Sequence, residues 1–338
     1  MPESLGVSIG VFAAATLVII VAGTYLARFA DELADRTGLG EALIGTLLLA
    51  GATSLPDFAA TLSASLAGRP ELAMSNVMGS MAANLAFLGI ADIVYRKANL
   101  EHAAASSPNL MQAALLIVLL AIPLIAMTSP VVTLWGIHPA TPLIAVAYLF
   151  GLSLVRSSHE RPMWFPRRTA QTVQDTPTSR PQGGLLRPWL AFGALTAVTA
   201  AAGWILMEMA KVITALTPLS DGVAGGLFTA IATSSPELVT TIAAIRQGAL
   251  TLAVSNIVGT NCFNMLVIAA ADATYPGGSI YHDITSVQVV WGLVTILMTG
   301  ILLLGMVRRE PFGVGRIGFE SALILSVYVL AAAIVILA

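Results

Sequence analysis

Two short polar motifs, offset by 180 residues, interrupt otherwise apolar segments of this 338-residue chain. The first reads Ala-Thr-Ser-Leu-Pro-Asp and ends at Asp57, and the second reads Ala-Thr-Ser-Ser-Pro-Glu and ends at Glu237. Each motif combines a carboxylate, hydroxyl groups and a proline. In hydrocarbon such groups are costly unless they face one another, water or an ion. The two motifs are therefore the first candidates for a functional site.

A second polar motif follows in each copy. It reads Ser-Asn-Val-Met-Gly-Ser and ends at Ser80 in the first copy, and its counterpart ends at Thr260. An asparagine follows one helical turn later, at Asn84 and at Asn264, so each hydroxyl and amide share one helix face. The glycine before each hydroxyl residue is expected to allow close approach of a neighbouring helix.

The two copies form an internal repeat. Residues 40–92 align with residues 220–272 without a gap, and roughly a third of the positions are identical, as expected of a duplication. The repeat ends at Asp92 and Asp272, which lie near span ends, where we expect a solvated or capping role. Asn76 and Asn256 are expected to bond between helices.

The residue types in both copies suit a hard cation. Pro56 and Pro236 have no N–H and clash with the carbonyl four residues back, which frees backbone carbonyls. Carboxylate, hydroxyl, amide and carbonyl oxygens are the ligands that Ca²⁺ and Na⁺ prefer. Two carboxylates neutralise one divalent ion, or two monovalent ions or protons in exchange. A single cysteine, Cys262, leaves no thiolate pair for zinc or copper.

The composition indicates an integral membrane protein. The chain is 57% hydrophobic and only 10% charged, whereas a soluble domain has about 25% charged residues. The N-terminus has no basic segment, so we expect the first apolar stretch to be a retained span. Hydropathy predicts an all-α membrane protein of about ten transmembrane helices, at residues 6–30, 41–66, 71–95, 109–128, 139–155, 189–216, 221–246, 250–272, 286–307 and 317–338.

A hydrophilic linker, rich in arginine and proline, divides the spans into two groups of five. The predicted units are a first five-helix repeat at 1–155, a linker loop at 156–188 and a second five-helix repeat at 189–338. Because each half holds an odd number of spans, the second half must enter the membrane from the opposite side. The two repeats are therefore expected to be inverted, with the binding site where they meet near the midplane.

The basic residues predict the orientation. If the N-terminus lies outside, all but two of the 16 lysines and arginines fall in cytoplasmic loops. The exceptions are Arg69, in an outer loop, and Lys211, within a span. The positive-inside rule then predicts both termini outside and the 156–188 loop in the cytoplasm. We expect the protein to lie in the plasma (inner) membrane.

The paired motifs resemble the two alpha repeats of the cation/calcium exchanger superfamily, which includes the Na⁺/Ca²⁺ exchangers. The family pattern is G-[TN]-S-x-P-[ED] on one span and G-[ST]-N-x-x-[ND] on the next, and the resemblance covers essentially the full chain. It implies ten helices, inverted repeats, and alternating access by sliding of the first and sixth helices. It also implies metal-ion ligands at the motif positions, namely Thr53, Ser54, Asp57, Ser80, Asn84, Thr233, Ser234, Glu237, Thr260 and Asn264.

Four positions depart from the family pattern. Ala52 and Ala232 replace the glycine that opens the first motif, and Asp57 replaces the usual glutamate, which is one methylene longer. Met81 replaces the first asparagine of the usual Ser-Asn pair, while Asn261 retains it. The second copy is thus the more typical of the two.

The function predicted from these features is secondary active antiport, with Ca²⁺ exchanged for Na⁺. A H⁺-coupled divalent cation exchanger stays open as the alternative, and a passive cation channel as a further one. An enzyme is not expected, because the hydroxyl and amide residues around the acids would have no role in an aspartic-protease dyad. No cofactor is expected beside the transported Ca²⁺ and Na⁺ or H⁺. The expected partners are inorganic cations and the lipid bilayer, with no nucleic acid, and the oligomeric state is open.

Overall fold

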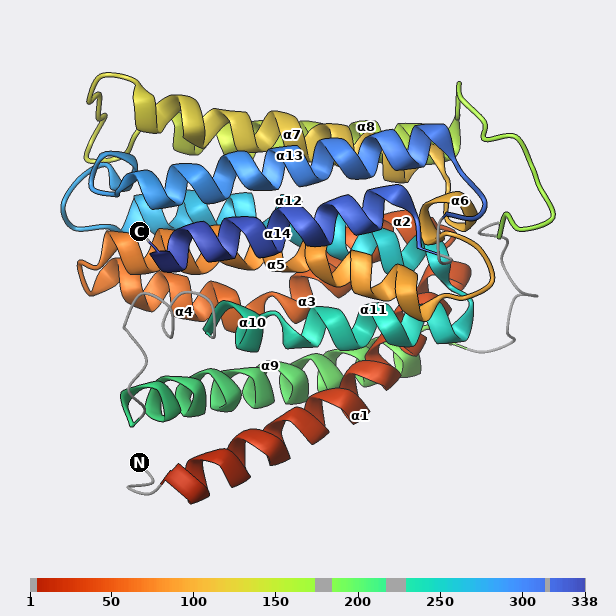
Figure 1. The fold of residues 1–338 in the computed structure, drawn as a ribbon, viewed down its shortest axis with the longest axis horizontal. Coiled ribbons are helices and arrows are strands. Elements are labelled where there is room, and N and C mark those ends of the chain that lie inside the picture. The colour runs from red at the N-terminus through yellow and green to blue at the C-terminus, as the bar shows by residue number, and fades with distance from the viewer. Residues whose placement is uncertain (1–4, 174–183, 217–228, 314–316, 338) are drawn as a thin grey trace.

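The structure is a computed structural model that describes residues 5–173, 184–216, 229–313 and 317–337. Within these residues every regular element is a helix, and most helices run along one common axis (Figure 1). The first helix begins and the last helix ends at the same end of the bundle, here called the termini end. The described parts of the 156–188 segment lie at the opposite end, here called the linker end.

Each half of the chain contributes long helices and one broken helix. The elements of the first half are α1 (Leu5–Thr37), α2 (Gly40–Ile44), the π-helical turn η1 (Gly45–Leu49), α3 (Ala50–Thr53), α4 (Leu55–Leu66), α5 (Pro70–Val94), α6 (Leu100–Ala103), α7 (Ser107–Thr128) and α8 (Ala140–Glu160). Those of the second half are α9 (Leu186–Ala215), α10 (Thr229–Thr233), α11 (Ser235–Gln247), α12 (Leu250–Thr274), the 3₁₀ turn η3 (Ile280–His282), α13 (Ser286–Arg308) and α14 (Phe319–Leu337).

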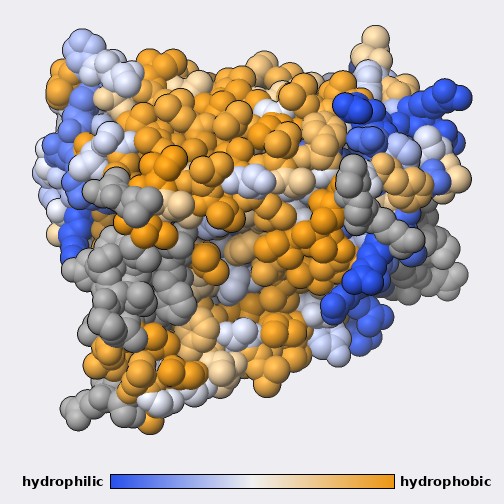
Figure 2. Space-filling view, viewed as in Figure 1, coloured by the Kyte–Doolittle hydropathy of each residue, from blue (hydrophilic) through white to orange (hydrophobic). Residues whose placement is uncertain are grey.

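The predicted spans agree with these helices. Among the described residues, eight helices are long and apolar enough to cross a membrane, and the bent pair Gly40–Thr53 and Leu55–Leu66 makes a ninth. One predicted span remains, 221–246. It begins outside the described residues, and α10 and α11 cover its described part. Figure 2 shows an apolar band across the middle of one face, with hydrophilic residues at both ends. The fold is therefore that of an all-helical membrane protein.

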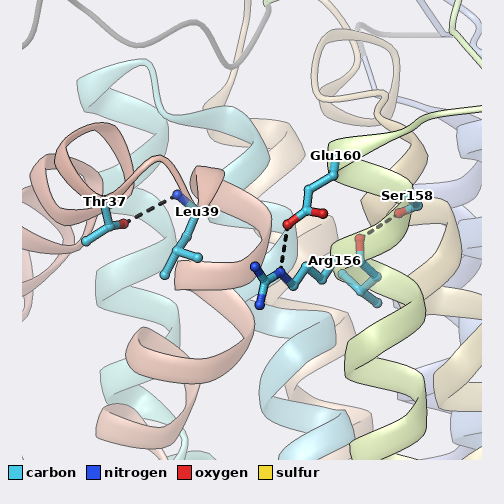
Figure 3. A network of polar contacts seen from close by, with 6 residues as sticks. Thr37, Leu39, Arg156, Ser158 and Glu160 are labelled. Carbon is cyan, nitrogen blue, oxygen red and sulfur yellow. Dashed lines mark hydrogen bonds and ion pairs between the residues drawn. The ribbon is translucent and has the colours of Figure 1, made fainter.

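Two helices continue beyond their predicted spans at the linker end. The extra turns of α8 carry Arg156, whose Nε lies 2.7 Å from Glu160 Oε1 (Figure 3). In the extra turns of α1, Arg36 pairs with Glu32 in the same way. Oppositely charged residues four apart stabilise a helix end only slightly. A span predicted from hydropathy ends near the first charged residues, so both helices are longer than predicted.

The two halves run in opposite directions. The broken helix of the first half leads from α2 at the linker end to α4 at the termini end, whereas α10 and α11 lead from the termini end to the linker end (Figure 1). α5 and α12 are the most buried long helices and pack on the broken helices and on each other. α1 and α9 pack together on one side of the bundle, against the broken helices. The breaks thus face each other in the middle of the fold.

The first broken helix changes direction by 53° at Ser54, where Pro56 occupies the first turn of α4. One turn earlier, η1 is wider than an α-helix, and the Ala50 N–H donates to Gly45 O, five residues back. Such a turn displaces backbone carbonyls from the usual ladder. The Ala42 carbonyl accepts from the Gly45 N–H and also from two side chains, Thr46 Oγ1 at 2.6 Å and Gln112 Nε2 at 3.2 Å.

Asp92 ties three segments together at the linker end. Its carboxylate is buried and accepts from the Leu100 N–H at 2.6 Å and from the Gly318 N–H at 3.1 Å. The end of α5 is thereby joined to the start of α6 and to the segment before α14. Asp92 is thus not solvated, and its carboxylate accepts from the first N–H of α6, as a capping group does.

Asp272 makes the matching arrangement at the termini end. It accepts from the Ile280 N–H at 3.0 Å and from the His138 N–H at 3.0 Å. The partners of Asp92 and Asp272 are themselves offset by 180 residues. The repeat therefore extends in space beyond the segments whose sequences align.

Candidate ion-binding site

All ten predicted site residues are fully buried, each with 0% of its surface exposed. They lie on four segments: the break between α3 and α4, the middle of α5, the break between α10 and α11, and the middle of α12. Because burial of so many polar groups in one place is costly, the contacts among them decide what the cluster can do.

The two carboxylates contact hydroxyl groups of the opposite repeat. Ser54 Oγ donates to Glu237 Oε1 at 3.5 Å, and Thr53 also lies within hydrogen-bonding reach of Glu237. Thr233 lies in the same way beside Asp57. The charges of Asp57 and Glu237 interact with each other. The acids of the two inverted halves thus belong to one cluster.

The helix ends around the break favour an ion. Asp57 and Glu237 stand in the first turns of α4 and α11, where the helix dipole stabilises negative charge. α3 and α10 end at Thr53 and Thr233, so their carbonyl ends also face the break. Within the first repeat, Ser80 Oγ on α5 donates to Asp57 Oδ1 at 3.2 Å.

The remaining predicted residues are buried near the acids without bonding to them. Among the described residues, no hydrogen bond joins Asn84, Ser234, Thr260 or Asn264 to either carboxylate. Asn84 Nδ2 instead donates to Asn261 Oδ1 at 3.0 Å. The structure therefore assembles Thr53, Ser54, Asp57, Ser80, Thr233 and Glu237 by direct contact and leaves the other four with unused polar atoms.

Unsatisfied oxygen atoms concentrate in this cluster. Eight buried side-chain oxygens of the two repeats accept no hydrogen bond within the protein: Asp57 Oδ2, Asn76 Oδ1, Asn84 Oδ1, Ser234 Oγ, Glu237 Oε2, Asn256 Oδ1, Thr260 Oγ1 and Asn264 Oδ1. Folded proteins leave few such atoms, and each one calls for an explanation. Buried oxygen atoms with free lone pairs are the ligands that a hard cation requires.

Backbone carbonyls differ between the two breaks. Pro236 cannot donate to the Ala232 carbonyl, and the Ser235 hydroxyl takes over at 2.9 Å. In the first repeat the matching position is Leu55, which has no hydroxyl to offer the Ala52 carbonyl. The first break is thus the better source of a carbonyl ligand.

Two asparagines near the acids were not predicted as site residues. Asn261 joins the repeats, because it accepts from Asn84 and donates through Nδ2 to Met81 O at 2.9 Å. Its retention of the family pattern was the available signal. Asn76 bonds to Thr61 Oγ1 at 3.1 Å, as expected of a helix–helix contact, and also lies within reach of Asp57.

The methionine at position 81 explains why Asn264 has no partner. Asn84 reaches Asn261, but the residue that Asn264 would reach by the same geometry is Met81, and both amide atoms of Asn264 are unsatisfied. We expect Met81→Asn to keep the thermal unfolding midpoint of the wild type, because a new hydrogen bond of about 0.5–1.5 kcal/mol offsets the buried amide. Leu85→Asn, equally buried one turn later on α5, should lower the midpoint clearly. Equal losses in the two variants would contradict this account.

The described residues contain no group of three or more His, Cys, Asp or Glu side chains placed to hold a metal ion. The cluster at the two breaks instead combines two carboxylates with hydroxyl and amide oxygens. This donor set fits an alkali or alkaline-earth cation rather than a nitrogen- or sulfur-bound transition metal.

Comparisons with known proteins identify the family of this chain. The sodium/calcium exchanger protein family matches residues 7–157 and 187–337, which together are most of the chain. The inner membrane protein YrbG of Escherichia coli K12 is 27% identical over 270 residues, which are 78% of this chain and 79% of that protein. The sodium/calcium exchanger MaX1 of Methanosarcina acetivorans is 24% identical over 284 residues, covering 77% and 81% of the two chains.

A solved structure shows the same fold. The sodium-calcium exchanger NCX_Mj, soaked with 10 mM Na⁺ and zero Ca²⁺, matches with a TM-score of 0.71 and 18% identity over 98% of this chain and 99% of that one. The match spans both halves and includes the broken helices. Taken with the duplicated motifs and the buried acids, these findings show that the chain belongs to the sodium/calcium exchanger family.

Proposed function

We propose that this protein exchanges Ca²⁺ for Na⁺ across the membrane, at a site formed by the ten predicted ligands. The observation that carries the proposal is the set of buried oxygen atoms without partners, contributed by both inverted repeats around two carboxylates. A divalent cation would neutralise Asp57 and Glu237 together. Two Na⁺ ions would do the same on the return step.

The position of the cluster supports alternating access. The site is at the breaks, midway between the ends of the bundle, and α1 and α9 pack across the broken helices. Sliding of this pair would open the site to one side at a time. In this scheme the ions are the substrates, and no cofactor takes part.

Proton coupling is the second candidate. Asp57 and Glu237 lie close enough for their charges to interact in a fully buried cluster. Two protons would neutralise them as well as two Na⁺ ions would. The orientation, with both termini outside and the linker end in the cytoplasm, also remains our proposal from the positive-inside rule.

Flux measurements separate these functions. The purified protein is reconstituted in liposomes, and uptake of radiolabelled Ca²⁺ is followed under a Na⁺ gradient or a pH gradient imposed separately. We expect an outward Na⁺ gradient to drive uptake and a pH gradient to have little effect. Uptake driven only by pH would establish proton coupling, and uptake indifferent to both gradients would indicate a channel and contradict the proposal. Liposomes without protein are the control.

A further inference from the structure

The two ends of the bundle are built alike beyond Asp92 and Asp272. His102 Nδ1 contacts the carbonyl of Arg309 at 2.6 Å, and His282 Nε2 contacts the carbonyl of Ser129 at 3.0 Å. Both pairs obey the same offset of 180 residues. The linker end and the termini end are therefore two copies of one structural unit, and differences between them are informative.

Two neighbouring positions break this similarity. The linker end has Glu101 and Glu320, where the termini end has Tyr281 and Ala140. Both glutamates are buried, each with only 1% of its surface exposed. The linker end thus holds two extra acidic groups that the repeat does not require, and neither belongs to the ion-binding site.

The two carboxyl groups meet in a space made for them. Glu101 on α6 and Glu320 in the first turn of α14 lie within hydrogen-bonding reach of each other. Ser321 Oγ donates to Glu101 Oε1 at 3.4 Å, but the Oε2 atom of each glutamate has no partner in the protein. A Cβ at Gly305 on α13 would lie 2.6 Å from Glu320 Cγ, so this glycine makes room for the side chain.

The two arginines at the end of α13 contact other groups than this pair. The charged and titratable groups at the described ends of the surrounding elements are Asp92, Tyr95, Arg96 and Lys97 at the end of α5 and just after it, His102 on α6, and Arg308, Arg309 and Glu310 at the end of α13. The Arg309 guanidinium donates to the carbonyls of His102 and Arg167. Arg308 lies over the Phe319 ring and 3.9 Å from Glu310. Among the described residues, no ion pair includes Glu101 or Glu320.

Two carboxylates in contact cannot both stay ionised in a buried site. Burial, together with the negative charges of Asp92 and Glu320, raises the pKa of Glu101 well above its ordinary value. Both oxygen atoms of Asp92 already accept backbone N–H groups, so this carboxyl group does not need the proton. A proton between Glu101 and Glu320 would satisfy the oxygen atoms that the protein leaves without a donor.

We propose that Glu101 and Glu320 form a proton-binding site, and that the shared proton holds α6 and α14 together beside the end of α5. Loss of this proton leaves two buried negative charges in contact and loosens the linker end. The contact between α6 and α14 therefore depends on pH, and it does so at the linker end only. It is independent of which ions the central site exchanges.

The termini end does not respond in the same way. At the place of Glu101, Tyr281 pairs its hydroxyl with Thr141 Oγ1 at 3.0 Å, and burial raises its pKa. Burial and the nearby charge of His282 lower the pKa of His138. Tyr281 therefore keeps its proton to higher pH than a free tyrosine, and the titration of His138 moves to the acid side of its ordinary range.

The sign of the pH effect follows from linkage. A carboxyl group whose pKa is higher in the folded than in the unfolded state favours folding most at low pH, and this contribution is lost as pH rises through the folded-state pKa. We expect the thermal unfolding midpoint of the full-length protein to fall as the pH rises above neutrality. In Glu101→Gln and in Glu320→Gln this fall should be at least halved, and both variants should exceed the wild type at the alkaline end.

Matched controls make the test specific. Glu71→Gln changes an exposed glutamate of α5 and should follow the wild-type profile. Infrared difference spectra of wild type against Glu101→Gln should show the C=O stretch of a protonated carboxyl at neutral pH and lose it in alkaline buffer. If Glu101→Gln does not fold, Glu320→Ala, which introduces the termini-end residue, gives the same two readings.

Two outcomes would overturn the proposal. One is a Glu101→Gln profile parallel to that of the wild type, without a carboxyl band in the difference spectrum. The other is a Ca²⁺-dependent shift of the profile that survives Glu237→Gln but is lost in Glu101→Gln, which would show that the glutamates bind a metal rather than a proton.

Discussion

Replacing Glu237 by glutamine should abolish Ca²⁺ uptake in proteoliposomes while the protein stays folded. The amide keeps the shape of the side chain and its contact with the Ser54 hydroxyl, but it removes one of the two charges that a divalent ion must neutralise. Disturbing even an indirect partner of a bound metal costs about 10–100-fold. Loss of a charged ligand should therefore reduce uptake by at least about 100-fold.

Stability provides an independent reading of the same change. A ligand at about 100 times its Kd stabilises the folded state by about 2.7 kcal/mol. Added Ca²⁺ should thus raise the thermal midpoint of the wild type and leave Glu237→Gln unmoved. Without Ca²⁺ the variant should be at least as stable as the wild type, since a like charge beside Asp57 has gone. Glu71→Gln is the matched control, and normal uptake by Glu237→Gln would refute the site.

The second large effect is expected at Gly259. A Cβ there would lie 2.5 Å from Thr46 Cα on η1, and a backbone atom cannot move aside as a flexible side chain can. Inserting a methyl group into such a contact costs about 1–3 kcal/mol. Gly259→Ala should therefore push α12 away from the broken helix, lower the thermal midpoint and remove most transport, because Thr260 is the next residue.

The repeat supplies the control for this prediction. Gly79 occupies the same motif position in the first copy, but a Cβ there would meet Ala230 Cβ at 3.5 Å, an ordinary contact. Gly79→Ala should retain the midpoint and the transport rate of the wild type. Thermal unfolding measures the midpoint, and radiolabelled Ca²⁺ uptake measures the transport rate. Equal losses in the two variants would show that packing of η1 on α12 is not the cause.

Much of the fold could be predicted, because its signals are local and repeated. Apolar runs of the right length indicated the helices, and the duplicated prolines indicated the breaks at Ser54 and Ser234. The proximity of Asp57 and Glu237 could also be predicted. An odd number of spans in each half inverts the second copy, and the site is expected where the two copies meet. The ten site residues stand as predicted ligands, and the structure shows that all of them are buried.

Other features depend on tertiary contacts that no local pattern reports. The π-helical turn has no sequence mark of its own, and the distances at Gly79 and Gly259 differ although both motifs have glycine there. The bonds of Asn261 to Asn84 and Met81 depend on how α12 packs against α5. The glutamates at the linker end are 219 positions apart in the numbering, from Glu101 to Glu320, so only the packing of α6 on its neighbours reveals that they meet.

The wide turn at Gly45–Leu49 has a mechanical consequence. Successive residues of an α-helix are separated by about 100° around its axis, since a full turn takes about 3.6 residues. If this turn tightened to ordinary α-helix, the stretch that follows it would swivel relative to the stretch before it, and Thr53 would point elsewhere. A small rotation within one helix would thus move the Thr53 hydroxyl toward Glu237 or away from it, without unwinding of either neighbouring segment.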